Sequence, residues 1–249
     1  MKRSIWIGHE PREQDAFEVA ARSIAGHAKE PIPTFAVSLD VLQRRGLYTR
    51  ATEHREGRLW DVVSGAPMST EFAISRFFVP LIASAYAAEP AEWALFMDCD
   101  MLVRADLNEL FALADPTKAI QVVQHDYAPA ETTKMDGQVQ TSYPRKNWSS
   151  VMLWNLRHPG NAALTVAKLN AWSGRALHGF QWLSDEFIGA LPACWNHLVG
   201  VDAPDPEAKI VHFTLGTPSM EGYANCEFAP EWWQYNAPLV IEPCPRIRH

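Results

Sequence analysis

The hydrophobic positions near the start of the chain predict a strand, a helix and a second strand. An apolar run at residues 4–8 is followed by a polar turn. Apolar side chains then recur at helical spacing over residues 15–24, and Gly26 is expected to end this helix. A second apolar run at residues 34–39 completes a β-α-β unit. Such a unit makes its two strands parallel, with a right-handed crossover between them.

The following residues continue this alternation of strands and helices. Apolar runs predict strands at 93–97, 119–123, 151–155 and 209–214, and helical periodicity predicts helices at 69–85, 106–111 and 162–172, with another beginning within 182–189. Two polar stretches, 47–69 and 125–146, have no clear period and are expected to be long functional or disordered loops. The Pro-rich C-terminal residues are expected to be irregular. Because no repeat or linker interrupts the pattern, we expect one α/β domain over residues 1–249.

The strand at 93–97 ends in two carboxylates, Asp98 and Asp100, with Cys99 between them. Side chains alternate along extended backbone, so the two aspartates should leave on one side and Cys99 on the other. Two close carboxylates repel each other unless a cation lies between them, and Mn²⁺ or Mg²⁺ prefers such oxygen ligands. The alternative is a solvated turn that leads to a helix capped by Asp106. The buried strand favours the metal site, because open α/β sheets bind ligands at the carboxyl ends of their strands.

Composition narrows the class of protein. The chain is 47% hydrophobic and 20% charged, which is enough to bury a sizeable core. A net charge of −7 argues against nucleic-acid binding by bulk electrostatics. No apolar run approaches the roughly 20 residues of a membrane-spanning helix, and the first apolar run is too short for a signal peptide. The four cysteines lack paired metal-type spacing. A reduced, cytoplasmic protein is therefore expected.

Four segments, taken in order, resemble the GT-A glycosyltransferases, most closely the retaining enzymes of glycosyltransferase family 8 and their relatives. They are the opening strand-turn-helix at 5–24; Ser75-Arg76-Phe77 ahead of residues 95–103 and 106–111; the strand 148–155, which begins Trp148-Ser149-Ser150; and His212 followed by Gly216 and Pro218. Each motif has moderate specificity, and their joint order over most of residues 3–218 carries the resemblance. It implies a Rossmann-like GT-A fold, with a mixed, mainly parallel sheet flanked by helices.

The resemblance also implies a site. Carried over position by position, it assigns the nucleotide-sugar donor to Ile7, Gly8, Glu10, Arg76, Asp98, Cys99, Asp100, Ser149 and Ser150. It makes Asp98, Asp100 and His212 the ligands of Mn²⁺ or Mg²⁺, and it places Asp185 and Glu186 near the anomeric carbon as catalytic groups. Structural alternatives stay open. Arg76 could be a surface arginine, His212 a core histidine, and the two acids the first turn of a helix.

The activity implied is metal-dependent transfer of a hexose from a nucleotide-diphosphate sugar, by the family's rule a uridine diphosphate sugar, with retention of configuration. Residues 1–110 would form the nucleotide-binding half, and 111–249 the sugar and acceptor half. The acceptor could be a saccharide, a lipid-linked glycan, a protein or another hydroxyl compound. The family often has a lysine shortly after the metal histidine, but residues 215–219 contain none. Arg76, Arg145 or Lys146 would have to supply that charge instead.

Two other classes compete with this interpretation. A sugar nucleotidyltransferase also uses paired carboxylates and a nucleotide, but its usual Gly-rich first turn is missing, since Gly8 is the only glycine there. A catalytically inactive nucleotide-sugar or carbohydrate-binding relative is the non-enzymatic alternative. An idle protein would have no physical need for the costly charge cluster of Asp98, Asp100 and His212.

Overall fold

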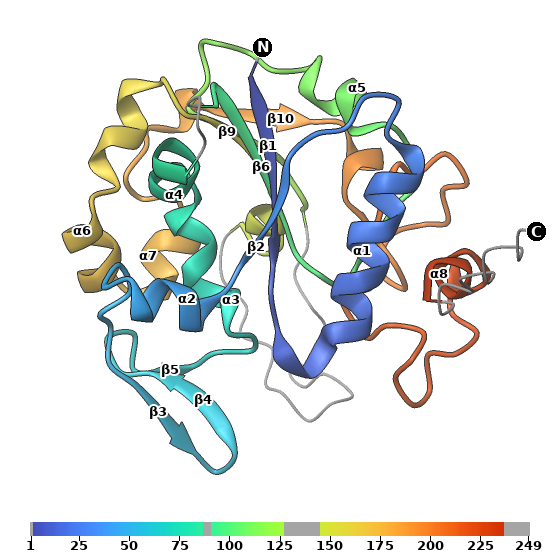
Figure 1. Ribbon diagram of the computed structural model, residues 1–249, viewed down its shortest axis with the longest axis horizontal. Helices are drawn as coiled ribbons and strands as arrows, with labels where there is room; N and C mark the ends of the chain where they lie inside the picture. Colours follow the sequence, from blue (N-terminus) through green and yellow to red (C-terminus); the bar gives the residue numbers. More distant parts are fainter. Residues whose placement is uncertain (1, 87–90, 127–144, 237–249) are drawn as a thin grey trace, which may run out of the picture.

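A six-stranded sheet forms the centre of the molecule, in the order β10-β8-β9-β6-β1-β2 (Figure 1). The computed structural model describes residues 2–86, 91–126 and 145–236. The strands of this sheet are β1 (Arg3–Gly8), β2 (Thr34–Val37), β6 (Trp93–Met97), β8 (Ile120–Val123), β9 (Val151–Asn155) and β10 (Ile188–Leu191). β1 runs parallel to β2 and β6, and β8 runs parallel to β10, whereas β9 is antiparallel to β6 and β8. The predicted mixed, mainly parallel sheet is confirmed.

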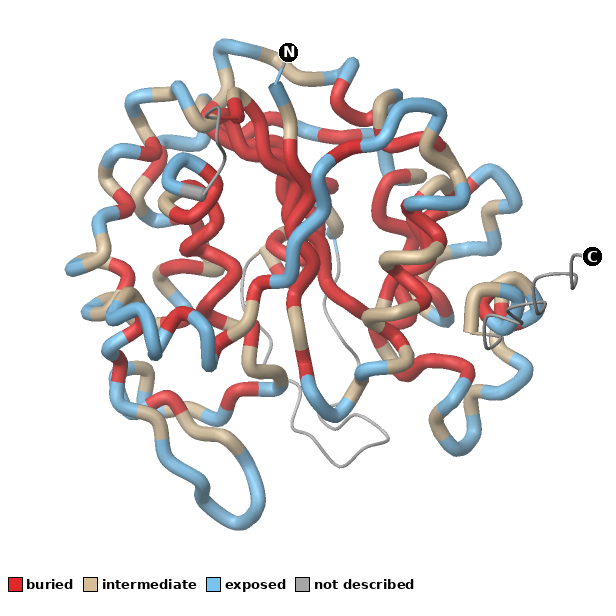
Figure 2. Tube along the Cα trace, viewed as in Figure 1, coloured by how far each residue is buried: buried red, intermediate tan, exposed pale blue. Residues whose placement is uncertain are grey.

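The burial of the strands follows their position in the sheet. Every residue of β6, β8 and β9 is buried, as Figure 2 shows for the central strands. At the edge, Thr34, Phe35 and Ala36 of β2 are exposed. The continuous apolar runs of the inner strands are what a sheet covered on both faces requires.

Helices lie on both sides of this sheet (Figure 1). On one side is α1 (Gln14–His27), against which α8 (Ala229–Asn236) packs. On the other side are α2 (Leu39–Arg44), α3 (Phe72–Ser75), α4 (Val79–Tyr86), α6 (Val166–Ala171) and α7 (Gly174–His178), and α5 (Leu107–Phe111) follows the strand β7. Within the described ranges, no helix has the length and apolar character needed to cross a bilayer.

A second, small sheet lies beside the carboxyl end of β6. It consists of β11 (His197–Leu198), β12 (Ile210–His212) and β7 (Met101–Val103), in that order. β12 is antiparallel to β7, so that His212 pairs with Met101. This pairing brings His212 next to Asp100 although the two are far apart in sequence.

A third sheet corrects one sequence-based expectation. The stretch 47–69, expected to be a long loop, contains the antiparallel strands β3 (Thr52–Arg55), β4 (Arg58–Asp61) and β5 (Ala66–Pro67). Strands this short show too few alternations for a period to be recognised. The usable signal was the two-residue turn Glu56-Gly57, in which both residues have positive φ angles, 51° and 76°. This conformation is typical of tight hairpins.

Other boundaries also differ from the prediction. Where a helix was expected within 182–189, a single 3-10 turn (Asp185–Phe187) leads into strand β10. The expected helix at 162–172 is divided into a 3-10 segment (Pro159–Ala163) and α6, because the Thr165 side chain caps the new helix. The C-terminal region expected to be irregular contains α8, whose Trp232 is fully buried. Further 3-10 turns cover Pro11–Glu13, Arg76–Phe78, Trp148–Ser150 and Ala193–Trp195.

A buried ion pair fixes the third sheet to the body of the protein. The side chains of Arg50 and Asp61 are 0% and 1% exposed and form a bidentate pair. Arg50 also donates to the carbonyl oxygens of Leu169 (2.7 Å) and Trp172 (2.6 Å), at the end of α6. Ser64 binds Asp61 and accepts a hydrogen bond from the backbone N–H of Gly174 (2.7 Å). The sheet is therefore tied to both α6 and α7.

We expect Arg50→Met to lower the free energy of unfolding by about 3–5 kcal/mol, because it leaves the Asp61 carboxylate buried without its counter-charge. The matched control is Arg44→Met, which removes the i,i+4 pair between Arg44 and Asp40, both well exposed. That variant should lose only about 0.3–0.5 kcal/mol. Urea unfolding of the two variants measures both values. Equal losses would contradict the role assigned to Arg50.

Candidate active site

A cleft of about 370 Å³ opens at the carboxyl ends of β1 and β6. Its lining includes Arg12, Glu13, Arg58, Met68, Arg76, Asp98, Asp100, Lys146, Asn147, Ser149, Ser150, Arg175, His178, His212 and Thr214. The cleft therefore brings together six of the site residues predicted from sequence: Arg76, Asp98, Asp100, Ser149, Ser150 and His212. They come from four separate parts of the chain, which the fold brings together at this cleft.

Asp98, Asp100 and His212 form a compact cluster. One ligand atom from each lies within 4.8 Å of the others, and His212 Nε2 is 3.4 Å from Asp100 Oδ2. Cys99 is fully buried and is not among the described residues that line the cleft, and its thiol lies 3.6 Å from Glu13 Oε2. Two carboxylate oxygens and one imidazole nitrogen are ligands that suit Mn²⁺ or Mg²⁺. The residues present thus fit a divalent ion.

Backbone hydrogen bonds between strands hold this cluster in place. The N–H of Asp98 donates to the carbonyl oxygen of Ser150 (3.0 Å). The N–H of Phe213 donates to the carbonyl oxygen of Asp100 (2.9 Å). Because β9 is antiparallel to β6, the residues that precede β9 lie next to those that follow β6. Two different strand pairings therefore position the two aspartates.

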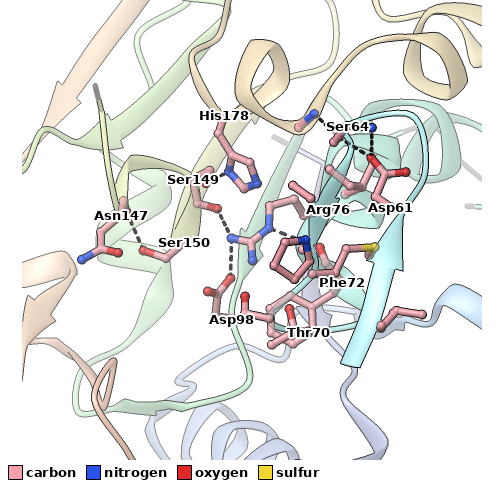
Figure 3. Close-up of a pocket in the computed structure, with 18 of the residues that line it drawn as sticks. Asp61, Ser64, Thr70, Phe72, Arg76, Asp98, Asn147, Ser149, Ser150 and His178 are labelled. Carbon is pink, nitrogen blue, oxygen red and sulfur yellow. Dashed lines mark hydrogen bonds and ion pairs between the residues drawn. The ribbon is translucent and has the colours of Figure 1, made fainter. Parts of the chain in front are cut away.

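Arg76 lies in the cleft and not on the outer surface of its helix. It is 6% exposed, so the surface-arginine alternative is wrong. Its Nη1 is 2.8 Å from Asp98 Oδ1 and donates to the Ser149 carbonyl oxygen at 2.8 Å (Figure 3). The guanidinium also lies 5.1 Å from the ring centroids of Phe72 and Phe96. These contacts fix one cation beside the carboxylates of the candidate metal cluster.

His178 is a cleft residue that no sequence motif indicated. Its Nδ1 is 2.7 Å from Ser149 Oγ (Figure 3). Its ring packs edge-on against Phe77. Burial lowers the pKa of His178 to about 3, and the positive charge of Arg76 acts in the same direction. A neutral imidazole therefore faces the cleft at neutral pH. Only the packing of α7 against the start of β9 brings the two side chains together.

Glu13 also lines the cleft, although its sequence context suggested only a polar turn. Burial, together with the nearby charges of Asp100 and Glu10, raises the pKa of Glu13 to about 7. Glu10 itself accepts hydrogen bonds from Arg12 Nε (2.7 Å) and from the N–H of Glu71 (2.9 Å). Burial raises the pKa of Glu10, but these hydrogen bonds lower it, and the net shift is downward. Glu10 thus holds together the two segments that border this end of the cleft.

Several predicted site residues are not among the described residues that line the cleft. Ile7 is fully buried in the core, and Gly8 faces the Phe72 ring, where an added Cβ would be 2.6 Å from the ring atoms. Asp185 and Glu186 are exposed on the 3-10 turn before β10, and Asp185 pairs with Arg145. The donor and catalytic roles of these residues, and of Glu10 and Cys99, remain predictions.

The three cations considered for the diphosphate occupy different places. Arg145 donates to the carbonyl oxygen of Gly179 (2.8 Å) and pairs with Asp185 outside the cleft lining. Arg76 and Lys146 both line the cleft, and Lys146 is only 9% exposed. Of the predicted loop 125–146, residues 127–144, with Tyr127 and Tyr143, lie outside the described residues.

The fold is similar to that of several solved glycosyltransferases. The chain is similar to LgtC, a galactosyltransferase solved with donor and acceptor sugar analogues (TM-score 0.56, 15% identity, 96% of this chain and 97% of that one). It is also similar to the bifunctional WbbM (TM-score 0.63, 14% identity, 94% of this chain) and to GlyE of Streptococcus pneumoniae TIGR4 (TM-score 0.58, 15% identity, 94% of this chain). The chain spans only 49% of the WbbM chain and 61% of the GlyE chain. The predicted GT-A fold is confirmed.

A closer relative comes from a plant. The chain is 42% identical over 233 residues to Protein CDI of Arabidopsis thaliana, a match that covers 92% of this chain and 83% of the plant protein. No family model matches the sequence. This chain therefore belongs to the same family as Protein CDI, and that family has the GT-A fold.

The pKa of His178 predicts how stability depends on pH. An exposed histidine titrates near 6.5, so between about pH 6.5 and pH 3 the unfolded chain binds a proton that the folded chain excludes. This contribution to stability is fully present above pH 6.5 and is lost as the pH falls. His178→Gln should therefore reduce the slope of unfolding free energy against pH by up to about 1.4 kcal/mol per unit.

Urea unfolding from pH 7.5 to pH 4 measures this slope in the wild type and in His178→Gln. Some slope should remain in the variant, because burial also lowers the pKa of His125, to about 4. Identical slopes in the two proteins would show that His178 is not held neutral.

Proposed function

We propose that this protein is a metal-dependent glycosyltransferase that moves a hexose from a nucleotide-diphosphate sugar to a hydroxyl acceptor. The main observation that supports this proposal is the cluster of Asp98, Asp100 and His212 at the carboxyl end of β6. It lies in a cleft that Arg76 also lines. Uridine diphosphate is the proposed nucleotide, retention is the proposed stereochemistry, and the cytoplasm is the proposed location. A saccharide or lipid-linked glycan is the proposed type of acceptor.

The metal cluster defines where the diphosphate would lie. Asp98, Asp100 and His212 would hold Mn²⁺ or Mg²⁺, which would act as a Lewis acid toward the departing diphosphate. The ligand set supplies two negative charges, and Arg76 is already paired with one of them. The negative charge of a diphosphate would therefore need a further positively charged group in the site. Lys146 lines the same cleft and is proposed to meet that demand, in place of the lysine missing after His212.

The sugar is expected to lie beyond the diphosphate, toward Ser149 and His178. In any nucleotide-diphosphate sugar the sugar is attached directly to the outer phosphate, so it must continue along the cleft from the metal. Ser149 and neutral His178 offer hydrogen-bonding groups without adding charge there. Ile7, Gly8 and Glu10 are proposed to support the nucleotide side through the segment after β1. Asp185 and Glu186 remain proposed as the acidic groups near the anomeric carbon, which requires the Arg145 ion pair to open.

The first test is a thermal-shift screen of nucleotide sugars with and without Mn²⁺. A ligand that binds only the folded protein stabilises it by about 2.7 kcal/mol at a hundred times its Kd. We expect a uridine diphosphate sugar to raise Tm only when the metal is present. Asp100→Asn keeps the shape of the side chain but removes its charge, and donor hydrolysis should fall at least about a hundredfold. A donor that binds equally well in chelator, or an Asp100→Asn variant with normal turnover, would contradict the proposal.

A second test concerns Lys146. Lys146→Met should weaken binding of the nucleoside diphosphate at least about tenfold, since it removes a charge-assisted contact of roughly 1.5–3 kcal/mol. Lys146→Arg should retain most of the affinity because it keeps the charge. Lys118→Met is the matched control, since the Lys118 side chain binds the Glu186 carbonyl oxygen outside the cleft lining. Calorimetry with uridine diphosphate and Mn²⁺ measures all three, and equal affinity in Lys146→Met and the wild type would remove Lys146 from the site.

A further inference from the structure

Asn196 is a fully buried residue outside the cleft lining that hydrogen-bonds the proposed metal ligand His212. Its Oδ1 lies 3.1 Å from His212 Nδ1, and its Nδ2 lies 2.8 Å from Ser150 Oγ and 3.4 Å from the carbonyl oxygen of Asn147. From the sequence, the pair Trp195-Asn196 could line the sugar or acceptor site, but no motif indicated a contact between Asn196 and His212. The contacts of Asn196 form a continuous chain from a backbone carbonyl to the metal cluster.

The direction of each hydrogen bond in this series follows from the first acceptor, the backbone carbonyl oxygen of Asn147. The carbonyl oxygen of Asn147 can only accept, and Ser150 Oγ is 2.6 Å away, so the Ser150 hydroxyl proton points to it. Asn147 has a left-handed backbone (φ 64°), a conformation that asparagine tolerates better than most residues. With its only proton in use, Ser150 Oγ must accept from the amide N–H₂ of Asn196. The amide oxygen of Asn196 therefore faces His212.

This orientation decides which nitrogen of His212 carries a proton. An amide oxygen can only accept, so Nδ1 of His212 must be the N–H donor. Nε2 is then the nitrogen available for a ligand bond, and it lies 3.4 Å from Asp100 Oδ2, within the cluster. Histidines that bind metals commonly have their other nitrogen held by an acceptor in this way, which fixes both the tautomer and the orientation of the ring.

We propose that Asn196 is a positioning residue that holds His212 as the Nδ1–H tautomer, so that Nε2 faces the metal. Ser150 supports two proposed metal ligands. Its hydroxyl binds Asn196, which holds His212, and its carbonyl oxygen accepts a hydrogen bond from the N–H of Asp98 (3.0 Å). The geometry of the cluster is thereby set before any ion enters. The inference rests on the proposed function, since it takes His212 to be a metal ligand.

Two readouts test the role of Asn196 without measuring glycosyl transfer. The first is the ¹⁵N spectrum of the histidine rings at pH 8 without metal, with the His212 signals assigned by their loss in His212→Gln. The second is Mn²⁺ affinity by calorimetry. In Asn196→Leu the acceptor is missing, so the Nδ1–H signature should disappear and the affinity should fall about 10–100-fold. Asn196→Asp keeps an acceptor, since the Ser150 hydroxyl can rotate to donate to it, and should keep both the signature and the affinity within about threefold.

The matched control is Asn161→Leu. Asn161 is also buried and donates to the carbonyl oxygens of Ala119 (2.7 Å) and Asn155 (2.9 Å), so the same substitution removes two hydrogen bonds in another part of the molecule. We expect it to lower Tm while Mn²⁺ affinity and the His212 signature stay unchanged. If Asn196→Leu does not fold, Ser150→Ala tests the same series of hydrogen bonds, because it removes the hydroxyl that binds Asn196. It keeps the carbonyl oxygen that binds Asp98, and it should still weaken Mn²⁺ binding several-fold.

The outcomes separate the inference from the proposed function. Wild-type protein that binds Mn²⁺, together with an Asn196→Leu variant that binds it equally tightly, would overturn the role of Asn196 alone. An equal loss of affinity in Asn161→Leu would do the same, because it would show a general effect of destabilisation. Wild-type protein with no affinity for Mn²⁺ or Mg²⁺ would instead overturn the proposed metal site, and the proposed function with it.

Discussion

Electrostatic repulsion between two carboxylates at the end of a buried strand is the constraint around which this structure is arranged. Asp98 and Asp100 leave β6 on the same side, where burial strengthens their mutual repulsion. The buried guanidinium of Arg76 offsets part of this cost at Asp98. Beside Asp100, the imidazole Nε2 of His212 lies 3.4 Å from the carboxylate oxygen Oδ2. Two carboxylates and an imidazole held this close together are a ligand set that suits a divalent cation.

Compare the buried pair of Arg50 and Asp61, which also borders the cleft. There the two charges are matched one to one, and the remaining hydrogen-bonding groups are used by backbone carbonyls and Ser64. Such a pair needs no ligand, and it fixes the small third sheet against α6 and α7. The two charge clusters show a division of roles within one cleft. The Arg50–Asp61 pair holds the cleft wall in place, while Asp98, Asp100 and His212 line the cleft and offer ligands for a cation.

The features that the sequence determined by itself are those that depend on neighbouring residues. The apolar run before Asp98 and the Asp106 cap of the next helix were both predicted, and both are observed. Each is a consequence of backbone geometry over a few positions. The order of strands and helices followed from the same local periodicity. The prediction from periodicity was wrong where elements are very short, as in the third sheet and the turn before β10.

Only the tertiary structure decided which distant side chains meet. The antiparallel pairing of β12 with β7 brings His212 to Asp100, and the packing of α7 against the residues before β9 brings His178 to Ser149. Asn196 has no local signature at all, because its role consists of contacts to residues 16 positions after it and 46 before it. The perturbed pKa values of His178 and Glu13 likewise arise from burial, which depends on every segment packed around them. Sequence patterns describe single elements, whereas the chemistry of this site arises between elements.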